Sequence, residues 1–187
     1  MMPNPPPFRT ISSRTVHKTS WVELVEHEAE ITATGRRFTY TYLESSPSVM
    51  VVAVSPEGKI PLIRQFRYPT QSFSYELPGG GSAGMTPDQA ALAELEEETG
   101  YRAGRIRKVG EFIVYCGLSD EVCHAYFAED LVPGEQKLEE TEHIEVCEFT
   151  PAEVEAMVRD GELRDGMALA ALHLAREALA GREAAGS

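Results

Sequence analysis

Residues 76–101 read ELPGGGSAGMTPDQAALAELEEETGY, and the predicted fold depends on this stretch more than on any other. After a glycine-rich turn, Thr86 offers a capping hydroxyl, followed by a proline and, three places after the cap, a glutamine. That order is typical of a helix N-terminus with a capping box. Good helix formers continue to Glu98, and Gly100 is a residue type that commonly ends helices. The sequence therefore predicts a glycine turn followed directly by one helix.

Three glutamates share one face of this predicted helix. With Glu94 placed at 0° and about 100° per residue, Glu98 lies near about 40° and Glu97 near about −60°. Three residues on the opposite side are predicted to face the core: Leu92, Leu95 and Thr99. Like charges at these spacings cost an isolated helix about 0.2–0.5 kcal/mol per pair. Such a face indicates either a solvated acidic stripe or a site for a hard divalent cation that takes oxygen ligands.

The spacing of these residues resembles the signature of Nudix hydrolases, G-x5-E-x7-R-E-U-x-E-E-x-G-U, where U is a bulky apolar residue. Gly79 matches the first glycine, Glu94 the glutamate after the arginine, Glu97 and Glu98 the paired acids, and Gly100 the last glycine. The resemblance implies an α+β fold, a Nudix-type α/β/α sandwich with a mixed sheet. It also implies that Glu94 and Glu98 bind Mg²⁺, or Mn²⁺ in its place, with help from the Gly79 carbonyl. Glu97 is implied as a catalytic residue beside them, as ligand or support.

Two positions depart from the signature. Met85 stands where the family has its first glutamate, and Ala93 stands where it has arginine. In the family the glutamate and the arginine at these positions lie near each other and stiffen the turn and helix. Their joint replacement therefore resembles the loss of one ion pair. The metal-binding acids are still present, and we expect a working metal site with weaker support around it.

Residues 62–69 (LIRQFRYP) and 75–78 (YELP) resemble the ADP-ribose pyrophosphatase branch, in which an R-Q-[YF]-R strand precedes E-[LF]-P-[AG]-G. The resemblance implies that Arg67 holds the diphosphate or caps the site, a task that suits the fixed fork of a guanidinium. Arg64 is a second candidate for substrate binding, and a surface arginine is the alternative interpretation.

Residues 117–121 (GLSDE) resemble a further segment of the same branch, which makes Ser119 a candidate for substrate binding. Cys116 stands where ADP-ribose enzymes carry a proline. This departure leaves open which nucleotide and which sugar the site accepts.

Residues 139–146 (EETEHIEV) match the loop before the last strand in that branch. The resemblance implies that a glutamate of this loop activates the attacking water, and Glu140 and Glu142 are the candidates, with Glu139 close behind. A loop that delivers a carboxylate when substrate binds is sensible chemistry for such a base. A solvated acidic loop is the alternative.

The sequence predicts three parts: residues 1–46, a tail and a dimerising β-hairpin; residues 47–180, the Nudix domain; and residues 181–187, a disordered tail. Two alternating stretches around a Thr-Gly-Arg turn, Trp21–Ala33 and Arg37–Leu43, predict the hairpin. In the branch that the chain resembles, this hairpin swaps across a two-fold axis and its aromatic residues can stack on adenine. The resemblance thus implies a homodimer, with Tyr40 as a candidate for substrate binding.

The remaining patterns predict a run of strands closed by helices, as in α+β proteins. Strands are predicted at residues 49–54, 60–66, 109–115, 122–128 and 144–149, and helices at residues 151–159 and 167–179.

Composition limits the class of protein. Seventeen basic and 30 acidic residues give a net charge of −13, which disfavours nucleic acid as a partner. No apolar run is long enough to span a bilayer and no secretory signal is evident, so we expect no membrane partner. Three cysteines at strand-like positions, Cys116, Cys123 and Cys147, are interpreted as buried residues of a reducing compartment, which favours a cytoplasmic enzyme.

Together these features predict Mg²⁺-dependent hydrolysis of a nucleoside diphosphate linked to another group, such as ADP-ribose or another nucleotide sugar. The products would be a nucleoside monophosphate and a phosphorylated sugar. The alternative from another class is a nucleotide-binding or regulatory module that keeps the fold and hydrolyses poorly, for which Met85 and Ala93 are the evidence.

Overall fold

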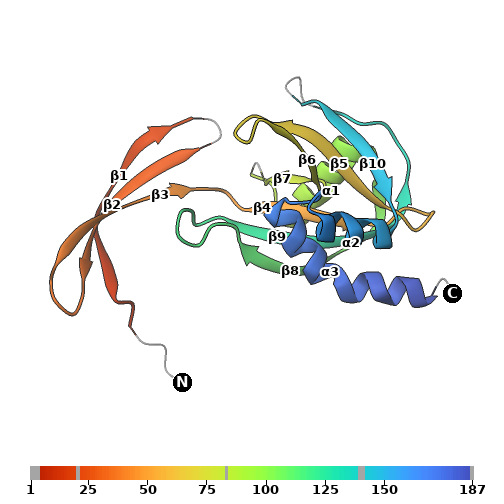
Figure 1. The fold of residues 1–187 in the computed structure, drawn as a ribbon. Coiled ribbons are helices and arrows are strands. Elements are labelled where there is room, and N and C mark those ends of the chain that lie inside the picture. Colours follow the sequence, from red (N-terminus) through yellow and green to blue (C-terminus); the bar gives the residue numbers. More distant parts are fainter. Residues whose placement is uncertain (1–4, 20–21, 83, 139–141, 186–187) are drawn as a thin grey trace. The chain divides into compact units, whose positions relative to one another are not determined.

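The computed structural model describes residues 5–19, 22–82, 84–138 and 142–185. The chain divides into two compact units, one formed by residues 1–46 with 113–121 and the other by residues 47–112 with 122–187. The elements are β1 (Phe8–Lys18), β2 (Glu23–Ile31), β3 (Arg37–Glu44), β4 (Ser48–Ala53), β5 (Ile60–Arg67), β6 (Ser72–Glu76), β7 (Gly79–Gly81), α1 (Pro87–Thr99), β8 (Arg102–Ile113), β9 (Val122–Val132), β10 (Ile144–Phe149), α2 (Pro151–Asp160) and α3 (Gly166–Ala185) (Figure 1).

The N-terminal unit is a three-stranded antiparallel sheet in the order β1-β2-β3. The hairpin predicted from the sequence is present as β2 and β3, with Gly35 at positive φ in the turn. The sequence did not predict β1, because its residues are polar or isolated apolar ones and ten of its eleven side chains are exposed. Trp21 lies outside the described residues.

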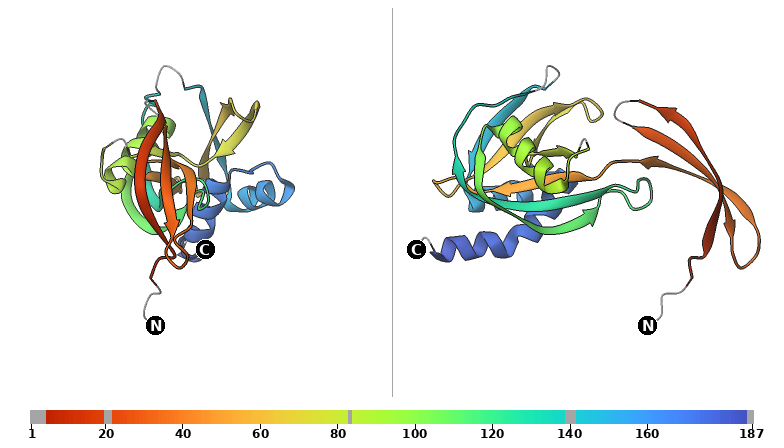
Figure 2. Two further views of the ribbon diagram at one scale, coloured as in Figure 1. Left: turned by 90° about the vertical axis from the view of Figure 1, so that its left-hand side faces the viewer. Right: turned by 180° about the vertical axis from the view of Figure 1, so that it is seen from behind.

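The larger unit holds two sheets, β7-β4-β9-β8 and β10-β5-β6. In the first, β4 runs parallel to β9 and antiparallel to β7, so the sheet is mixed, as expected. Helix α1 contacts β4 and β7, whereas α3 contacts β4 and β9. The views from the front and from behind place these two helices on opposite faces of the sheet (Figures 1 and 2). The α+β class and its layered arrangement are thereby confirmed.

Helix α1 begins and ends where the sequence predicts. Thr86 accepts a hydrogen bond from the Gln89 amide in a complete capping box, and Gly100 closes the helix at φ 77°. The predicted core face was wrong for one residue, since Leu92 is 41% exposed. In its place the helix buries Glu98, which is only 4% exposed, together with Ala90, Ala91, Leu95 and Thr99. The two alanines contact the apolar face of β4 and β9, and this packing turns Glu98 inward.

Two boundaries differ most from the expectation. Strand β8 starts at Arg102, seven residues before the predicted start, because Arg102–Lys108 is too polar to show a buried strand pattern. Helix α3 continues to Ala185, so residues 181–185 belong to a helix and not to a disordered tail. Among the described residues, no helix has the length and apolar character needed to cross a membrane.

Candidate active site

The carboxylate of Glu98 lies at the centre of the candidate site. It is buried beside the turn that precedes α1, and its Oε2 accepts a hydrogen bond from the Gly79 amide at 2.7 Å. The pKa of Glu98 is raised to about 8, chiefly by burial and in addition by the charges of Glu94, Glu142 and Glu76, while the hydrogen bond from the Gly79 amide lowers it. A buried carboxylate among other carboxylates favours a cation beside Glu98.

Glu94, one turn earlier on α1, lies against the backbone of Gly80. A Cβ atom at Gly80 would overlap with the Glu94 carboxylate, whereas a Cβ atom at Gly81 would meet nothing within 4 Å. The second glycine of the turn is thus required for Glu94 to occupy its position. The predicted metal ligands Glu94, Glu98 and Gly79 are therefore brought together, with Gly79 contacting Glu98 through its amide.

A second buried carboxylate, Glu76 at the end of β6, connects this cluster to Arg67 at the end of β5. Arg67 Nε donates to Glu76 Oε1 at 2.8 Å, a second guanidinium nitrogen donates to Oε2, and Gln65 also donates to Oε2 at 3.1 Å. These hydrogen bonds raise the pKa of Arg67, and the charges of Glu76, Glu98 and Asp165 raise it further. The sequence predicted Arg67 as a site residue but not Glu76. The E-L-P motif that contains Glu76 could have indicated it.

Asp165 joins the site from the start of α3. Its Oδ2 accepts a hydrogen bond from the Ala168 amide at 2.7 Å, which caps the helix. Burial raises the pKa of Asp165, and the charge of Glu76 adds to this, while the charge of Arg67 lowers it. No sequence pattern indicated this residue, because only the packing of α3 on the sheet brings it near β5.

Of the two glutamates expected to act on water, the structure describes Glu142 but not Glu140. Glu142 lies close enough for its charge to raise the pKa of Glu98, so it belongs to the cluster. Glu140 and Glu139 lie outside the described residues. Glu97 is an exposed residue of α1, and its main-chain carbonyl accepts a hydrogen bond from the Lys137 amide.

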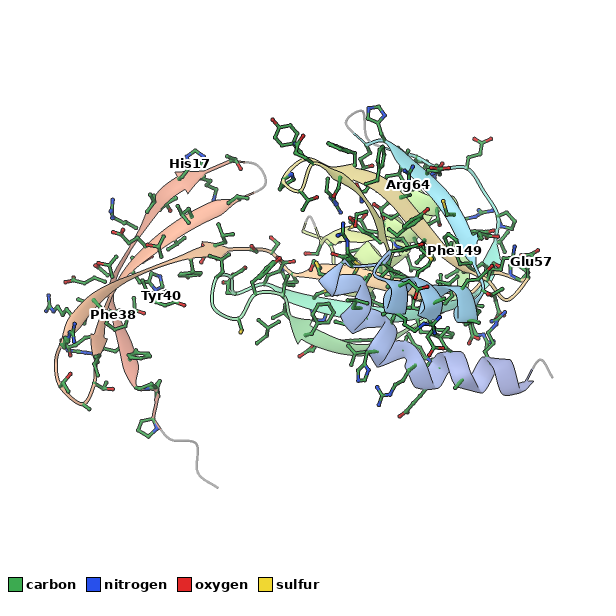
Figure 3. All side chains as sticks on the ribbon, in the orientation of Figure 1. His17, Phe38, Tyr40, Glu57, Arg64 and Phe149 are labelled. Carbon is green, nitrogen blue, oxygen red and sulfur yellow. The ribbon has the colours of Figure 1, made fainter. Side chains whose placement is uncertain are left out.

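The other predicted substrate-binding residues are held by local contacts. Arg64 lies on β5 (Figure 3). It pairs with Glu145 at 3.2 Å, and its guanidinium lies 4.1 Å from the centre of the Phe73 ring. Tyr40 and Ser119 belong to the N-terminal unit. Tyr40 donates to the Gly117 carbonyl at 2.9 Å, and Ser119 bonds Ser45 at 3.4 Å.

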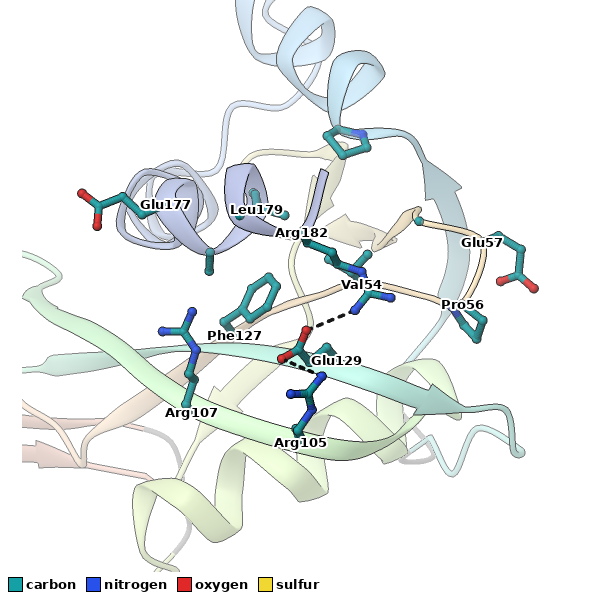
Figure 4. Close-up of a pocket in the computed structure, with 14 residues that line it drawn as sticks. Val54, Pro56, Glu57, Arg105, Arg107, Phe127, Glu129, Glu177, Leu179 and Arg182 are labelled. Atoms are coloured by element: carbon teal, nitrogen blue, oxygen red, sulfur yellow. Dashed lines mark hydrogen bonds and ion pairs between the residues drawn. The ribbon is translucent and has the colours of Figure 1, made fainter. Parts of the chain in front are cut away.

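A groove of about 930 Å³ lies elsewhere, between the last turns of α3, strands β8 and β9, and the turn after β4 (Figure 4). Arg105 and Arg182 approach Glu129 from two sides, at 3.3 and 3.2 Å. Arg107 lies 5.4 Å from the centre of the Phe127 ring. The paired arginines fasten the end of α3 to the sheet, and none of the candidate site residues lines this groove.

The donor set around Glu98 fits a divalent cation. Among the described residues, no three or more His, Cys, Asp and Glu side chains are arranged to hold a metal ion by themselves. Mg²⁺, however, is commonly bound by one or two carboxylates together with water and substrate phosphates. Glu98 and Glu94 supply two carboxylates on adjacent turns, and Gly80 leaves room beside them.

Comparison with known proteins agrees with this geometry. The family model of the NUDIX domain matches residues 44–170, a range that contains Arg67, the glycine turn, α1 and Glu142. The chain belongs to the NUDIX domain family. In the Nudix box of this chain, Met85 is 39% exposed on the turn and Ala93 lies on α1, so the two departures flank the acid cluster without removing any of its carboxylates.

The relatives and a solved structure extend this assignment. An ADP-ribose pyrophosphatase of Bacillus subtilis is 34% identical over 160 residues, which cover 84% of this chain and 86% of the relative. A methanol dehydrogenase activator of Bacillus methanolicus is 28% identical over 88% of this chain and 90% of its own. A GDP-mannose pyrophosphatase of Yersinia enterocolitica is 32% identical over 65% of this chain and 68% of its own. The crystal structure of an ADP compounds hydrolase superposes with a TM-score of 0.84 at 21% identity, covering 96% of this chain and 98% of that one, which confirms the Nudix fold.

Proposed function

We propose that this Nudix protein is a pyrophosphohydrolase that cleaves nucleotide sugars to a nucleoside monophosphate and a phosphorylated sugar. Its relatives include enzymes named for ADP-ribose and for GDP-mannose, which supports a nucleotide sugar as the substrate class. ADP-ribose is the first candidate because the relative named for it is 34% identical over most of both chains.

One observation carries the proposal. The buried carboxylate of Glu98 faces the charges of Glu94, Glu142 and Glu76, and the Arg67 guanidinium is fixed on Glu76 at the same place. An acidic cluster beside a fixed arginine suits a diphosphate that arrives with a divalent cation.

The proposed cofactor is Mg²⁺, with Mn²⁺ as a substitute. Glu94 and Glu98, together with the main-chain carbonyl of Gly79, are the residues that would hold it. When bound, the ion would act as a Lewis acid on the diphosphate oxygens and lower the pKa of a bound water. Exposed Glu97 is proposed to support these ligands.

The side chains of the protein would then position substrate and proton acceptor. Arg67, held by Glu76, would bind the diphosphate and neutralise charge that develops during cleavage. Glu142, or Glu140 of the same loop, would orient the attacking water and accept its proton. Arg64 is proposed as a further contact to the substrate, and so are Ser119 and Tyr40, which rest on the resemblance of their segments alone.

The assembly and location are also proposals. We expect a homodimer formed through the N-terminal strands, since a sheet as exposed as β1-β2-β3 is marginally stable without a partner surface. A cytoplasmic location fits three cysteines that are all free. Their predicted burial is wrong for Cys116, which is exposed in a turn, whereas Cys123 is buried and Cys147 is half-buried.

The test of this function is a panel of nucleotide sugars, including ADP-ribose and GDP-mannose, assayed for release of AMP or GMP with Mg²⁺ or Mn²⁺. We expect hydrolysis that chelation by EDTA abolishes and added Mg²⁺ restores. Glu98→Gln should reduce kcat by at least about 100-fold while the protein stays folded. Glu96→Gln, on another side of the same helix, is the matched control and should keep wild-type activity. Full activity in Glu98→Gln would contradict the assignment.

A second candidate is a nucleotide-binding or regulatory module with little turnover. Met85 and Ala93 in the Nudix box favour it, and so does the relative named as a methanol dehydrogenase activator. Tight binding of a nucleotide sugar without release of nucleotide at any metal concentration would favour this candidate over the first.

A further inference from the structure

The chain that follows β9 returns to the C-terminal end of α1. Two glycines allow the close approach, because a Cβ atom on Gly100 would lie 2.9 Å from the Gly134 carbonyl oxygen. Conversely, a Cβ atom on Gly134 would lie 2.8 Å from the Gly100 carbonyl oxygen. Residues 134–137 therefore lie directly on the last turn of the acidic helix.

Two donors of this segment satisfy carbonyls at the end of α1. The Lys137 amide donates to the Glu97 carbonyl at 2.9 Å, and Gln136 Nε2 donates to the Glu98 carbonyl at 2.6 Å. The Glu96 carbonyl is bonded within the helix cap by the Gly100 amide. The last carbonyls of a helix have no partner within the helix, and α1 has no basic residue in its last turn. The returning segment supplies the missing donors.

The hydrogen bond from Gln136 ends on the residue whose carboxylate lies at the centre of the candidate site. The same segment leads along the chain to Glu142, whose charge acts on Glu98. Gln136 thus holds the backbone of Glu98 from a segment that precedes Glu142 in the sequence.

We propose that Gln136 is a positioning residue for Glu98. By holding the main-chain carbonyl of Glu98, it fixes the last turn of α1 and with it the direction of the Glu98 carboxylate. This inference rests on the proposed hydrolase function, in which Glu98 is a metal ligand.

The neighbouring side chain of Lys137 makes a different kind of contact. Its Nζ pairs with Glu96 Oε1 at 2.7 Å, and the Lys137 side chain is 63% exposed. Exposed ion pairs contribute little. Removing the Lys137 side chain also leaves the backbone donor to Glu97 in place, so Lys137→Ala is a matched control for Gln136.

The experiment compares Gln136→Ala, Gln136→Glu and Gln136→Lys with Lys137→Ala in the full-length protein. The readouts are kcat and KM for nucleotide-sugar hydrolysis, Mn²⁺ affinity by isothermal titration calorimetry, and thermal unfolding. Loss of a group that supports a metal ligand commonly costs about 10–100-fold. We expect Gln136→Ala and Gln136→Glu to lose kcat and Mn²⁺ affinity in that range while KM changes by less than about threefold. Gln136→Lys restores a donor and should recover most of both, and Lys137→Ala should match the wild type.

Wild-type kcat and Mn²⁺ affinity in Gln136→Ala would overturn the proposal. So would losses that only follow a loss of folded protein, or losses that Gln136→Lys fails to repair. If the wild type hydrolyses no nucleotide sugar, the proposed function fails. The order of Mn²⁺ affinities among the same variants then still decides whether Gln136 positions Glu98.

Discussion

At the scale of single residues, Glu98 has two unusual properties, burial and a raised pKa. A carboxylate that is 4% exposed and surrounded by other carboxylates is costly to ionise, and Gly79 provides only one compensating hydrogen bond. A cation bound beside Glu98 would stabilise the ionised carboxylate and offset this free-energy cost. The buried carboxylate of Glu76 in the same site is stabilised differently, because Arg67 and Gln65 donate hydrogen bonds to its oxygens.

The raised pKa predicts how stability depends on pH in metal-free protein. The pKa of Glu98 rises from 4.5 to about 8 on folding, so the folded state favours the protonated form. The stabilisation from this group is fully present below pH 4.5 and is lost as the pH rises through about 8. The free energy of unfolding, measured with urea in EDTA, should therefore fall more steeply over this window in the wild type than in Glu98→Gln. Parallel curves would contradict the prediction, and Mg²⁺ should offset the fall by favouring the ionised form.

At the scale of elements, the short strand β7 and helix α1 act as one unit. Gly79 approaches β4 so closely that a Cβ atom would overlap with the Val49 carbonyl oxygen, and Gly80 lies equally close to Glu94. Because Gly79 and Gly80 have no side chain, β7 can approach both β4 and α1 closely. Any larger residue at these two positions would prevent that approach.

Adjacent glycines of β7 provide a sharp test of this unit. Gly80→Ala should displace the Glu94 carboxylate and lower hydrolysis by about 10–100-fold, the usual cost of disturbing the support of a metal ligand. Gly81→Ala adds the same methyl group one residue later, where nothing lies within 4 Å, and should keep wild-type activity. Steady-state kinetics over a range of Mg²⁺ concentrations measures both. Equal activity in the two variants would show that the position of Glu94 does not depend on Gly80.

At the scale of the whole molecule, the two units differ in how they are stabilised. The larger unit buries a continuous core, whereas the N-terminal unit exposes Phe8 and Val16 on β1, Tyr40 on β3, and Val22 just before β2. Small isolated sheets are marginal in water. A second copy of the chain is therefore the expected partner for these strands.

Sedimentation analysis should find a dimer of the full-length protein. Val16→Lys places a charge on an exposed apolar position of β1 and should raise the dissociation constant at least about tenfold, which corresponds to about 1.4 kcal/mol. Ser13→Lys, which adds the same charge at a polar position of β1, is the control and should dimerise like the wild type. A monomeric wild type would contradict the proposed assembly.

Features that depend on residues close together in the chain could be predicted from the sequence alone. Helix α1 begins after Thr86 and ends at Gly100 as predicted, because N-terminal capping and left-handed termination involve only residues within one turn. The spacing of Gly79, Glu94, Glu97, Glu98 and Gly100 was sufficient to predict the family, since one turn and one helix carry them all. Most strand positions in the larger unit followed from apolar runs for the same reason.

Leu95 and Thr99 of α1 are buried as predicted, but the burial of Glu98 depends on packing between elements. The wheel placed Leu92 in the core, but the alanine contacts with β4 and β9 buried Glu98 instead. The structure also brought Glu76 and Asp165 to Arg67, and Gln136 to the end of the acidic helix. Asp165 and Gln136 are distant in sequence from the residues that they contact and carry no local pattern, because their positions result from how sheets and helices pack and not from the conformations of their own segments.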